Sequence, residues 1–275
     1  MKYTLQSTKY VFRNFLYVFP FAILPALFIS FSTDEIAIHY VLEVFFGGNL
    51  QAWDFKSLFA SVSVLNFASW KAIFAGFIGV LVLVPSVALM MAMLEKHMRI
   101  GKRTFNGVFS KLNDNLISTC GYALLLLAIY EIWSLITACL LFFVSRINAV
   151  VIAYAFSVMV FLAMHFVLLY VISGIYLWLP CMQITGFRVG EALYYSARLS
   201  APVKWKILFG QLIVILVSEI SICVCAWYAV SFLWFTLLST ALYAVMLMLY
   251  CVRMQIAYFD LDNIDRADLH GYYRR

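Results

Sequence analysis

The sequence predicts an all-α, polytopic integral membrane protein with six transmembrane helices in three hairpins. Of its 275 residues, 65% are hydrophobic and only 12% are charged, whereas soluble domains are about half apolar and about a quarter charged. The apolar residues form long uncharged runs that can each supply the ~20 residues needed to cross a bilayer. Lysine and arginine are concentrated between alternate runs, which is typical of cytoplasmic loops. The net charge of +6 therefore indicates orientation and not binding of nucleic acid.

The first predicted span covers about residues 15–31 and follows a basic segment in which Lys9 and Arg13 share one helical face. We expect this start to be retained, because the apolar run is too long for a signal peptide. The third and fourth spans are longer than a crossing needs, so they should tilt or project from the bilayer. The remaining spans are predicted at about 72–94, 116–144, 149–179, 207–233 and 235–259.

Residues 32–70 form the only long loop between spans, and we expect this loop to be extracytoplasmic. Asp34 and Asp54 each precede apolar residues at helical spacing, as helix N-caps do. The pattern predicts two short helices lying in the outer headgroup layer. The alternative is a ligand-binding loop that contains His39 and Trp53.

Two segments, 101–113 and 186–200, are predicted to form amphipathic helices along the cytoplasmic membrane surface, and residues 260–275 a cytoplasmic tail. Their cations and those that follow them could bind anionic lipid or a partner protein. These residues are Lys102, Arg103, Lys111, Arg188, Arg198, Lys204 and Lys206. Assembly into a homo-oligomer or a larger membrane complex is left open.

The distribution of cations predicts that both termini are cytoplasmic. Of the 19 lysine and arginine residues, only Lys56, Lys71 and Arg146 fall on the predicted outer side. Such a bias sets the orientation of membrane proteins. We therefore predict a multi-pass protein of the cell membrane with six spans, the amino terminus inside and the carboxyl terminus inside.

The segment from Gly186 to Glu219 has a weaker copy from Gly101 to Glu131. In each copy a glycine and an arginine open a basic segment, a Lys-Leu or Arg-Leu pair follows, and an acid lies 19 or 20 residues beyond that leucine. Each unit would contain an amphipathic helix, an outgoing span and a returning span. Duplication is one explanation, and alternating topology by itself is the other.

The second copy carries a resemblance to a known family. It reads Gly186-x-Arg-x-Gly-Glu-Ala-Leu-x-x-Ser-x-Arg-Leu and is followed by a basic step and a span. This pattern, with the aromatic and acidic ending from Tyr250 to Asp260, resembles an uncharacterised family of bacterial multi-pass membrane proteins. That family is related to the membrane domain of glycerophosphoryl diester phosphodiesterases. The resemblance covers about residues 186–265. It implies a six-helix membrane protein and no established activity, since the hydrolase's catalytic domain has no counterpart here.

Three ionisable residues fall near the middle of predicted spans: Glu131, His165 and Glu219. Charges at that depth are costly, so such groups face the bundle interior, pair or stay neutral. One interpretation is a proton- or cation-coupled site in which His165 bridges the two glutamates. The other is protonated glutamates that join helices through hydrogen bonds. Gln211 and Ser218 share one face of the fifth span and could extend a polar track, although bonding to neighbouring backbone is favoured.

No enzyme, cofactor or metal motif stands out. Asp260, Asp262 and Asp265 are weak candidates for a divalent cation, but no EF-hand glycine or closing glutamate accompanies them. We expect these acids to dock against the basic loops around Lys102 and Arg198. No phosphate-binding loop, nucleophile elbow or zinc motif is present. We thus expect neither cofactor nor catalysis.

Two functions remain as hypotheses. The first is a small transport or export component for a lipid-like or small solute, with the three midplane residues as its polar core. The second is a non-transporting scaffold or regulatory subunit that binds anionic lipid or a partner through its basic surface. A wet polar cavity favours the first, and a dry packed core favours the second.

Overall fold

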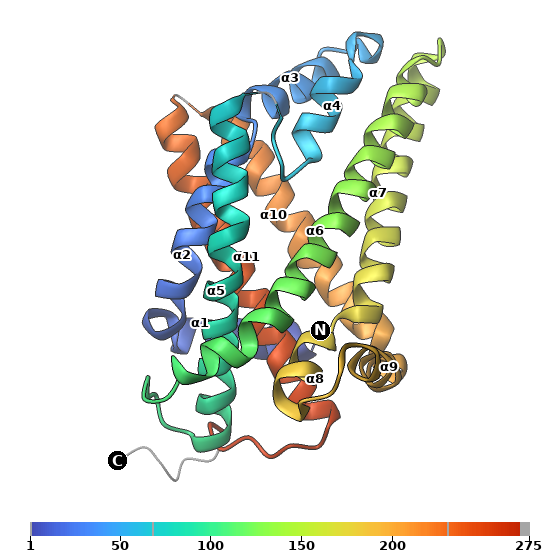
Figure 1. Cartoon of the computed structure of the whole chain (residues 1–275). Helices are drawn as coiled ribbons and strands as arrows, with labels where there is room; N and C mark the ends of the chain where they lie inside the picture. The colour runs from blue at the N-terminus through green and yellow to red at the C-terminus, as the bar shows by residue number, and fades with distance from the viewer. Residues whose placement is uncertain (1, 68, 230, 270–275) are drawn as a thin grey trace.

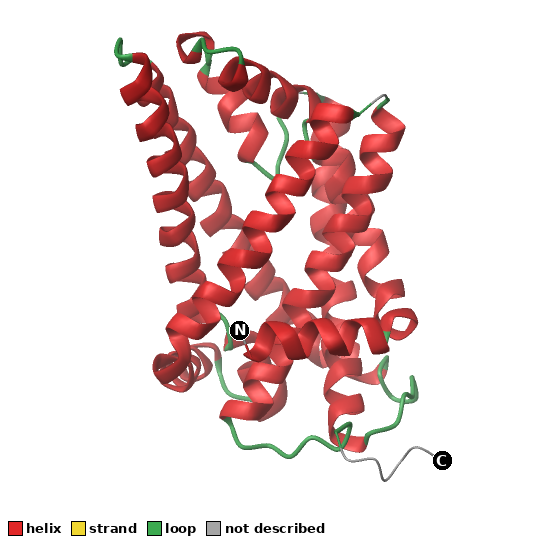
Figure 2. Cartoon of the chain, turned by 180° about the vertical axis from the view of Figure 1, so that it is seen from behind, coloured by secondary structure: helices red, strands yellow, loops and turns green. Residues whose placement is uncertain are grey.

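A computed structural model describes residues 2–67, 69–229 and 231–269 of the chain. Within those residues it is helical throughout, with short turns and no strand (Figures 1 and 2). The helices are α1 (Lys2–Arg13), α2 (Phe15–Ser32), α3 (Glu35–Phe46), α4 (Phe55–Val62), α5 (Trp70–Ile100), α6 (Ser110–Ser145), α7 (Val150–Ile175), α8 (Trp178–Thr185), α9 (Val189–Ser200), α10 (Lys204–Tyr228) and α11 (Phe232–Leu261), with single 3₁₀ turns at Leu50–Ala52 and Ala201–Val203.

Six helical segments of the described chain are long and apolar enough to cross a membrane, and each overlaps one predicted span. They contain α2, α5, α6, α7, α10 and α11. The chain is therefore a multi-pass membrane protein. Figure 1 shows α3 and α4 at one end of the bundle and α1, α8 and α9 at the other. We call these the α3 end and the α1 end.

Helices α2, α5 and α11 form the tightest part of the bundle, and α11 packs more extensively on α2 than on its hairpin partner α10. Glycines bring α5 close to α2. A Cβ atom added at Gly79 would lie 3.3 Å from Cβ of Phe28, and one at Gly76 would lie 2.7 Å from Oγ of Ser32. Any larger side chain at Gly76 would push the two helices apart, because interiors of this density leave no room.

The α6–α7 hairpin leans away from this three-helix group toward the α3 end (Figure 1). Helix α6 packs on α5 near one end, α7 packs on α10, and α10 passes behind both in the first view. Helix α6 has 36 residues, and α7 together with α8 covers Val150–Thr185. The third and fourth spans are therefore longer than the ~20 residues that a crossing needs, as predicted. In Figure 1, α6 is visibly inclined to α5.

The prediction of an amphipathic helix at 101–113 is wrong for residues 101–109, which are not helical. Gly101 ends α5 with φ +75°, its N–H bonded to the His97 carbonyl, and helix resumes only at Ser110. Gly107 also has a left-handed φ of +72°, a conformation that glycine tolerates and a helix does not contain. The irregular path buries Val108 in the core. Apolar spacing alone suggested a helix that these two glycines interrupt.

The second amphipathic segment is helical where predicted. Helix α9 begins at Val189 after a short loop and buries Ala192, Ser196 and Ser200, while its other face is exposed. The Trp178 indole donates a hydrogen bond to the Val189 carbonyl and ties α9 to α8. Its contact with a membrane surface stays a prediction.

Both short helices of the 32–70 loop begin where the sequence predicts. Asp34 accepts a hydrogen bond from the Ala37 N–H at 3.0 Å, and Asp54 accepts one from the Ser57 N–H at 2.8 Å. They do not form a simple surface layer, however. Helix α4 runs inward along α6, and the segment after it descends between the helices before α5 begins (Figure 1).

Candidate functional site

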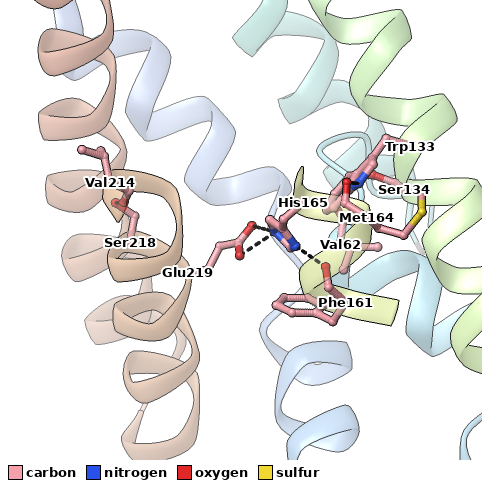
Figure 3. Close-up of polar contacts among 9 residues, drawn as sticks. All are labelled: Val62, Trp133, Ser134, Phe161, Met164, His165, Val214, Ser218 and Glu219. Atoms are coloured by element: carbon pink, nitrogen blue, oxygen red, sulfur yellow. Dashed lines mark hydrogen bonds and ion pairs between the residues drawn. The ribbon is translucent and has the colours of Figure 1, made fainter. Parts of the chain in front are cut away.

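His165 of α7 and Glu219 of α10 form an ion pair inside the bundle. The His165 Nε2 atom lies 2.9 Å from Oε1 and 2.8 Å from Oε2 of the Glu219 carboxylate. On the opposite side of the ring, Nδ1 lies 2.8 Å from the Phe161 carbonyl oxygen. Figure 3 shows both contacts, with Glu219 reaching across from α10. The imidazole is fully buried, whereas the Glu219 side chain retains 26% of its exposure.

Aromatic rings surround the imidazole and hold it in place. The Trp133 ring of α6 meets it edge-on at 4.8 Å between centroids, and the Phe161 ring lies 4.3 Å away. The Trp133 N–H donates to the Met164 carbonyl at 2.6 Å, which joins α6 to α7 beside the histidine (Figure 3). The ring has no exposed surface, so the exposed part of the pair is the Glu219 side chain.

The contacts of the two ring nitrogens define how many protons the pair holds. A carbonyl oxygen only accepts, so Nδ1 of His165 carries a hydrogen and donates it to Phe161. Nε2 then faces a carboxylate, and a close contact requires a second hydrogen, either on the ring or on Glu219. Without it, the Nε2 lone pair would face a negative oxygen. The pair therefore binds one exchangeable proton.

Glu131 of α6 has a different role from the one predicted. Its carboxylate accepts hydrogen bonds from the Ser63 hydroxyl at 2.7 Å and from the backbone N–H groups of Val64 and Leu65 at 3.1 and 3.0 Å. The expectation that His165 bridges both glutamates is thus only half correct. His165 binds Glu219, and Glu131 holds the segment that descends after α4.

Two further hydroxyl groups form hydrogen bonds with this segment, residues 62–66. The Ser32 hydroxyl donates to the Val64 carbonyl at 2.8 Å, and the Ser134 hydroxyl donates to the Val62 carbonyl at 3.1 Å. Non-helical backbone at membrane depth is tolerated only where protein or an aqueous cavity satisfies its polar groups. Here side chains of α2 and α6 form hydrogen bonds with those backbone groups. We call residues 62–66 the re-entrant segment.

Tyr130 of α6 lies near both Glu131 and Glu219. Trp133, three residues after Tyr130, touches His165. Helix α6 therefore contacts both the re-entrant segment, through Glu131 and Ser134, and the His165 ring, through Trp133.

Gln211 and Ser218 do not extend this polar layer. The Ser218 hydroxyl donates to the Val214 carbonyl of its own helix at 2.8 Å, as the favoured interpretation expected (Figure 3). Gln211 is buried, and neither atom of its amide has a hydrogen bond of normal geometry. It lies two turns from Ser218, beside Tyr176, toward the α1 end.

The predicted basic residues divide between internal contacts and exposed surface. Lys111 pairs with the buried Glu95 at 3.1 Å, and Arg103 donates to the Arg13 carbonyl at 3.2 Å. Lys204 lies over the Tyr170 ring at 3.5 Å. The side chains of Lys102, Arg188, Arg198 and Lys206 are exposed.

The acids of the tail are used in contacts within the chain. Asp260 accepts from the Lys2 ammonium at 2.9 Å and from the Tyr3 hydroxyl at 2.8 Å, while Asp262 accepts from the hydroxyls of Tyr195 and Tyr258. Asp262 thus docks on α9, the helix of Arg198, and Asp260 docks on α1, which was not expected. Among the described residues, which include Asp265, no three His, Cys, Asp or Glu side chains gather as metal ligands.

Sequence reasoning missed two features. The re-entrant segment, which includes Ser63, lacks any charge or motif that marks it. Arg253 did carry a signal, because it is the only charge between Phe232 and Phe259 in α11. It is 4% exposed, donating to the Tyr176 hydroxyl and the Gly210 carbonyl.

No protein-family model, curated protein or solved structure matches this chain. The resemblance of residues 186–265 to the phosphodiesterase-related membrane family therefore stays a prediction.

Proposed function

We propose that this protein is a proton-coupled transport or export component for a small or lipid-like solute. The His165–Glu219 pair carries the proposal, because it places one exchangeable proton between two helices that are long and apolar enough to span a membrane. Ionisable residues within membrane spans mark proton relays and substrate paths by default. In this scheme Glu219, as the more exposed partner, exchanges the proton, and His165 stores it.

The re-entrant segment supports the same function. Irregular backbone at membrane depth is characteristic of transporters and channels, where it lines the path of the solute. Glu131 binds this segment through three hydrogen bonds. Protonation of Glu131 would weaken its acceptance of the two backbone N–H groups, so proton movement can be linked to movement of the segment.

The first experiment tests whether the pair binds a proton. Trp133 touches the His165 ring, so its fluorescence, taken as wild type minus Trp133→Phe, should change when the ring titrates. We expect one titration step, which is absent in His165→Gln. In Glu219→Gln it should shift by about one pH unit or more, because the ring loses its charged partner. An unshifted step in Glu219→Gln would show that the two residues are not coupled.

The second experiment tests transport. Proteoliposomes with a pH-sensitive dye inside are given a pH step, and the rate of internal pH change is measured. We expect Glu219→Gln to slow the rate at least about tenfold relative to wild type, since a neutral amide cannot exchange the proton. Glu43→Gln is the matched control, because Glu43 is an exposed acid of α3. Equal rates in wild type and both variants would refute proton-coupled transport.

The exposed cations at the α1 end favour a second candidate, a scaffold or regulatory subunit that binds anionic lipid. Arg188, Arg198 and Lys206 are exposed on and near α9, and cations beside a membrane helix attract anionic headgroups. Native mass spectrometry in mixed micelles tests this. Retention of phosphatidylglycerol over phosphatidylcholine should fall in the Arg198→Gln, Lys206→Gln double variant. If the double variant retained as much phosphatidylglycerol as wild type, and the liposome assay showed proton flux, this candidate would be ruled out.

A further inference from the structure

Arg253 is a buried cation without a counter-ion. Its Nε donates to the Tyr176 hydroxyl at 3.1 Å and its Nη1 donates to the Gly210 carbonyl at 2.8 Å. Both acceptors are neutral, and the guanidinium carbon lies 5.8 Å from the centroid of the Tyr176 ring. The other buried arginine, Arg266, is paired with Asp268 at 2.8 Å. No carboxylate of the described chain pairs with Arg253 in this way.

Such a group is costly unless its charge is compensated. A guanidinium cannot release its proton in a protein, and a buried charge without a partner destabilises a fold. Two neutral hydrogen bonds leave most of that charge unbalanced. The position is therefore one where an anion would be bound favourably.

The Gln211 amide, which approaches the Tyr176 hydroxyl without a hydrogen bond of normal geometry, adds a second polar group at the same place. Gln211 follows Gly210 in α10 and lies beside the Tyr176 hydroxyl that Arg253 binds. It is 1% exposed, and neither its Nε2 nor its Oε1 makes a hydrogen bond of normal geometry. Buried amide groups rarely lack hydrogen bonds of normal geometry. An oxyanion between Arg253 and Gln211 could accept hydrogen bonds from both.

Helix α1 covers this position. The Thr4 hydroxyl reaches the Gly210 carbonyl at 3.5 Å, and a Cβ atom at Gly210 would lie only 2.7 Å from that hydroxyl oxygen. The glycine thus lets α1 lie directly on α10. The amino end of α1 is tied down by the Lys2–Asp260 ion pair, whose side chains are 59% and 37% exposed. Exposed pairs contribute little, so the burial of Tyr3, Tyr10 and Val11 in the core, more than this ion pair, holds α1 over the position.

We propose that Arg253 and Gln211, beneath α1, bind a phosphate group. A guanidinium matches phosphate through paired N–H donors, and the amide N–H supplies a further donor. The group could be inorganic phosphate or the phosphate of a lipid headgroup, because the site lies toward the α1 end, where the bundle ends. This proposal does not depend on the proton-coupled function, since it uses none of the residues of the His165–Glu219 pair.

The test is ligand-dependent thermal stability of the purified full chain in detergent. One arm adds inorganic phosphate at constant ionic strength against chloride, and the other adds short-chain phosphatidic acid against short-chain phosphatidylcholine. We expect a saturable rise in Tm for wild type in at least one phosphate arm. Arg253→Gln should abolish the rise. Arg146→Gln should retain it, because Arg146 also binds backbone carbonyls but lies at the α3 end.

Gln211→Leu keeps the proposal testable if Arg253→Gln does not fold. For a purely structural site, replacing an unbonded amide with an apolar side chain should be neutral or stabilising and should leave the phosphate response unchanged. We expect instead that about tenfold more phosphate is needed for half of the Tm rise. A response to phosphate alone identifies a soluble ligand, and a response to phosphatidic acid alone identifies a lipid. No response in either arm, or an equal response in Gln211→Leu, would overturn the proposal.

Discussion

The two buried histidines of this protein differ in what their Nδ1 atoms meet. In His165, Nδ1 donates to a carbonyl and leaves Nε2 to share a proton with Glu219. In His97, Nδ1 contacts the Tyr10 hydroxyl. Burial raises the pKa of Tyr10 well above its usual value, so this hydroxyl stays protonated and donates to Nδ1. Protonation of His97 at Nδ1 would remove that acceptor. His165 is thus suited to hold an extra proton, and His97 is suited to remain neutral.

Replacing Glu131 with glutamine tests its hold on the re-entrant segment. The amide has one acceptor oxygen in place of two and loses the charge, and hydrogen bonds to charged groups contribute about 1.5–3 kcal/mol. We expect hydrogen exchange at Val64 and Leu65 to become at least about tenfold faster in Glu131→Gln. Exchange in α3 should not change. Protection equal to wild type would show that Ser32 and Ser134 hold the segment without Glu131.

At this scale the sequence predicted which ionisable residues lie within apolar helices better than it predicted their partners. Glu131, His165 and Glu219 could be identified because charges are rare in apolar spans. The different partners of Glu131 and Glu219 could not be predicted, because they depend on residues 62–66 entering the bundle. That segment contains serine, valine and leucine, and nothing in such a composition distinguishes surface loop from re-entrant backbone.

At the scale of elements, caps were predictable and irregular segments were not. Asp34 and Asp54 cap α3 and α4 as predicted, since a capping acid leaves a local signature. The stretch 101–109 has the apolar spacing of a helix but follows the left-handed turns at Gly101 and Gly107. Its path depends on Phe105 reaching the Tyr17 ring of α2, with centroids 5.1 Å apart. A contact so distant in sequence cannot be found from periodicity.

The cap of α4 provides a prediction at this scale. Burial opposes ionisation of Asp54, but hydrogen bonds from Ser57 and Lys56 outweigh it and hold the pKa of Asp54 below its usual value. Because the folded pKa is lowered, the stabilisation is present above the unfolded value of about 3.9 and is lost as pH falls through the folded pKa. At neutral pH we expect Asp54→Ala to cost about 1 kcal/mol.

That loss should be local to α4. Hydrogen exchange of residues 57–62 should become faster in Asp54→Ala at pH 7. The matched variant Asp34→Ala should instead accelerate exchange in α3, because Asp34 caps that helix in the same way. If Asp54→Ala left α4 as protected as in wild type, packing against α6 and not the cap would hold this helix.

At the scale of the whole molecule, the two sequence copies do not produce two equivalent units. The upstream copy lacks the amphipathic helix that α9 provides in the downstream copy, and its acid, Glu131, binds backbone where Glu219 binds histidine. The six spans were predictable from hydropathy and length. Their packing was not, because α11 lies chiefly against α2, and apolar composition does not specify which helices meet.

The orientation of the bundle gives the last prediction. Among the lysines and arginines of the described residues, only Lys56, Lys71 and Arg146 lie in or next to the loops that connect spans at the α3 end. From the bias of charged loops we predict that the α1 end faces the cytoplasm. Single cysteines at Lys56 and Gly190 test this, because both positions are exposed. They are introduced after replacement of the six native cysteines. An impermeant maleimide should label Lys56→Cys in intact cells and Gly190→Cys only after lysis.

Labelling of both cysteines in intact cells would place the two ends on one side and contradict the six-span topology. The reverse pattern would keep six spans and invert the protein. In an inverted bundle, the phosphate site beneath α1 would face the outer leaflet. The labelling result therefore also decides from which side a phosphate ligand must reach Arg253.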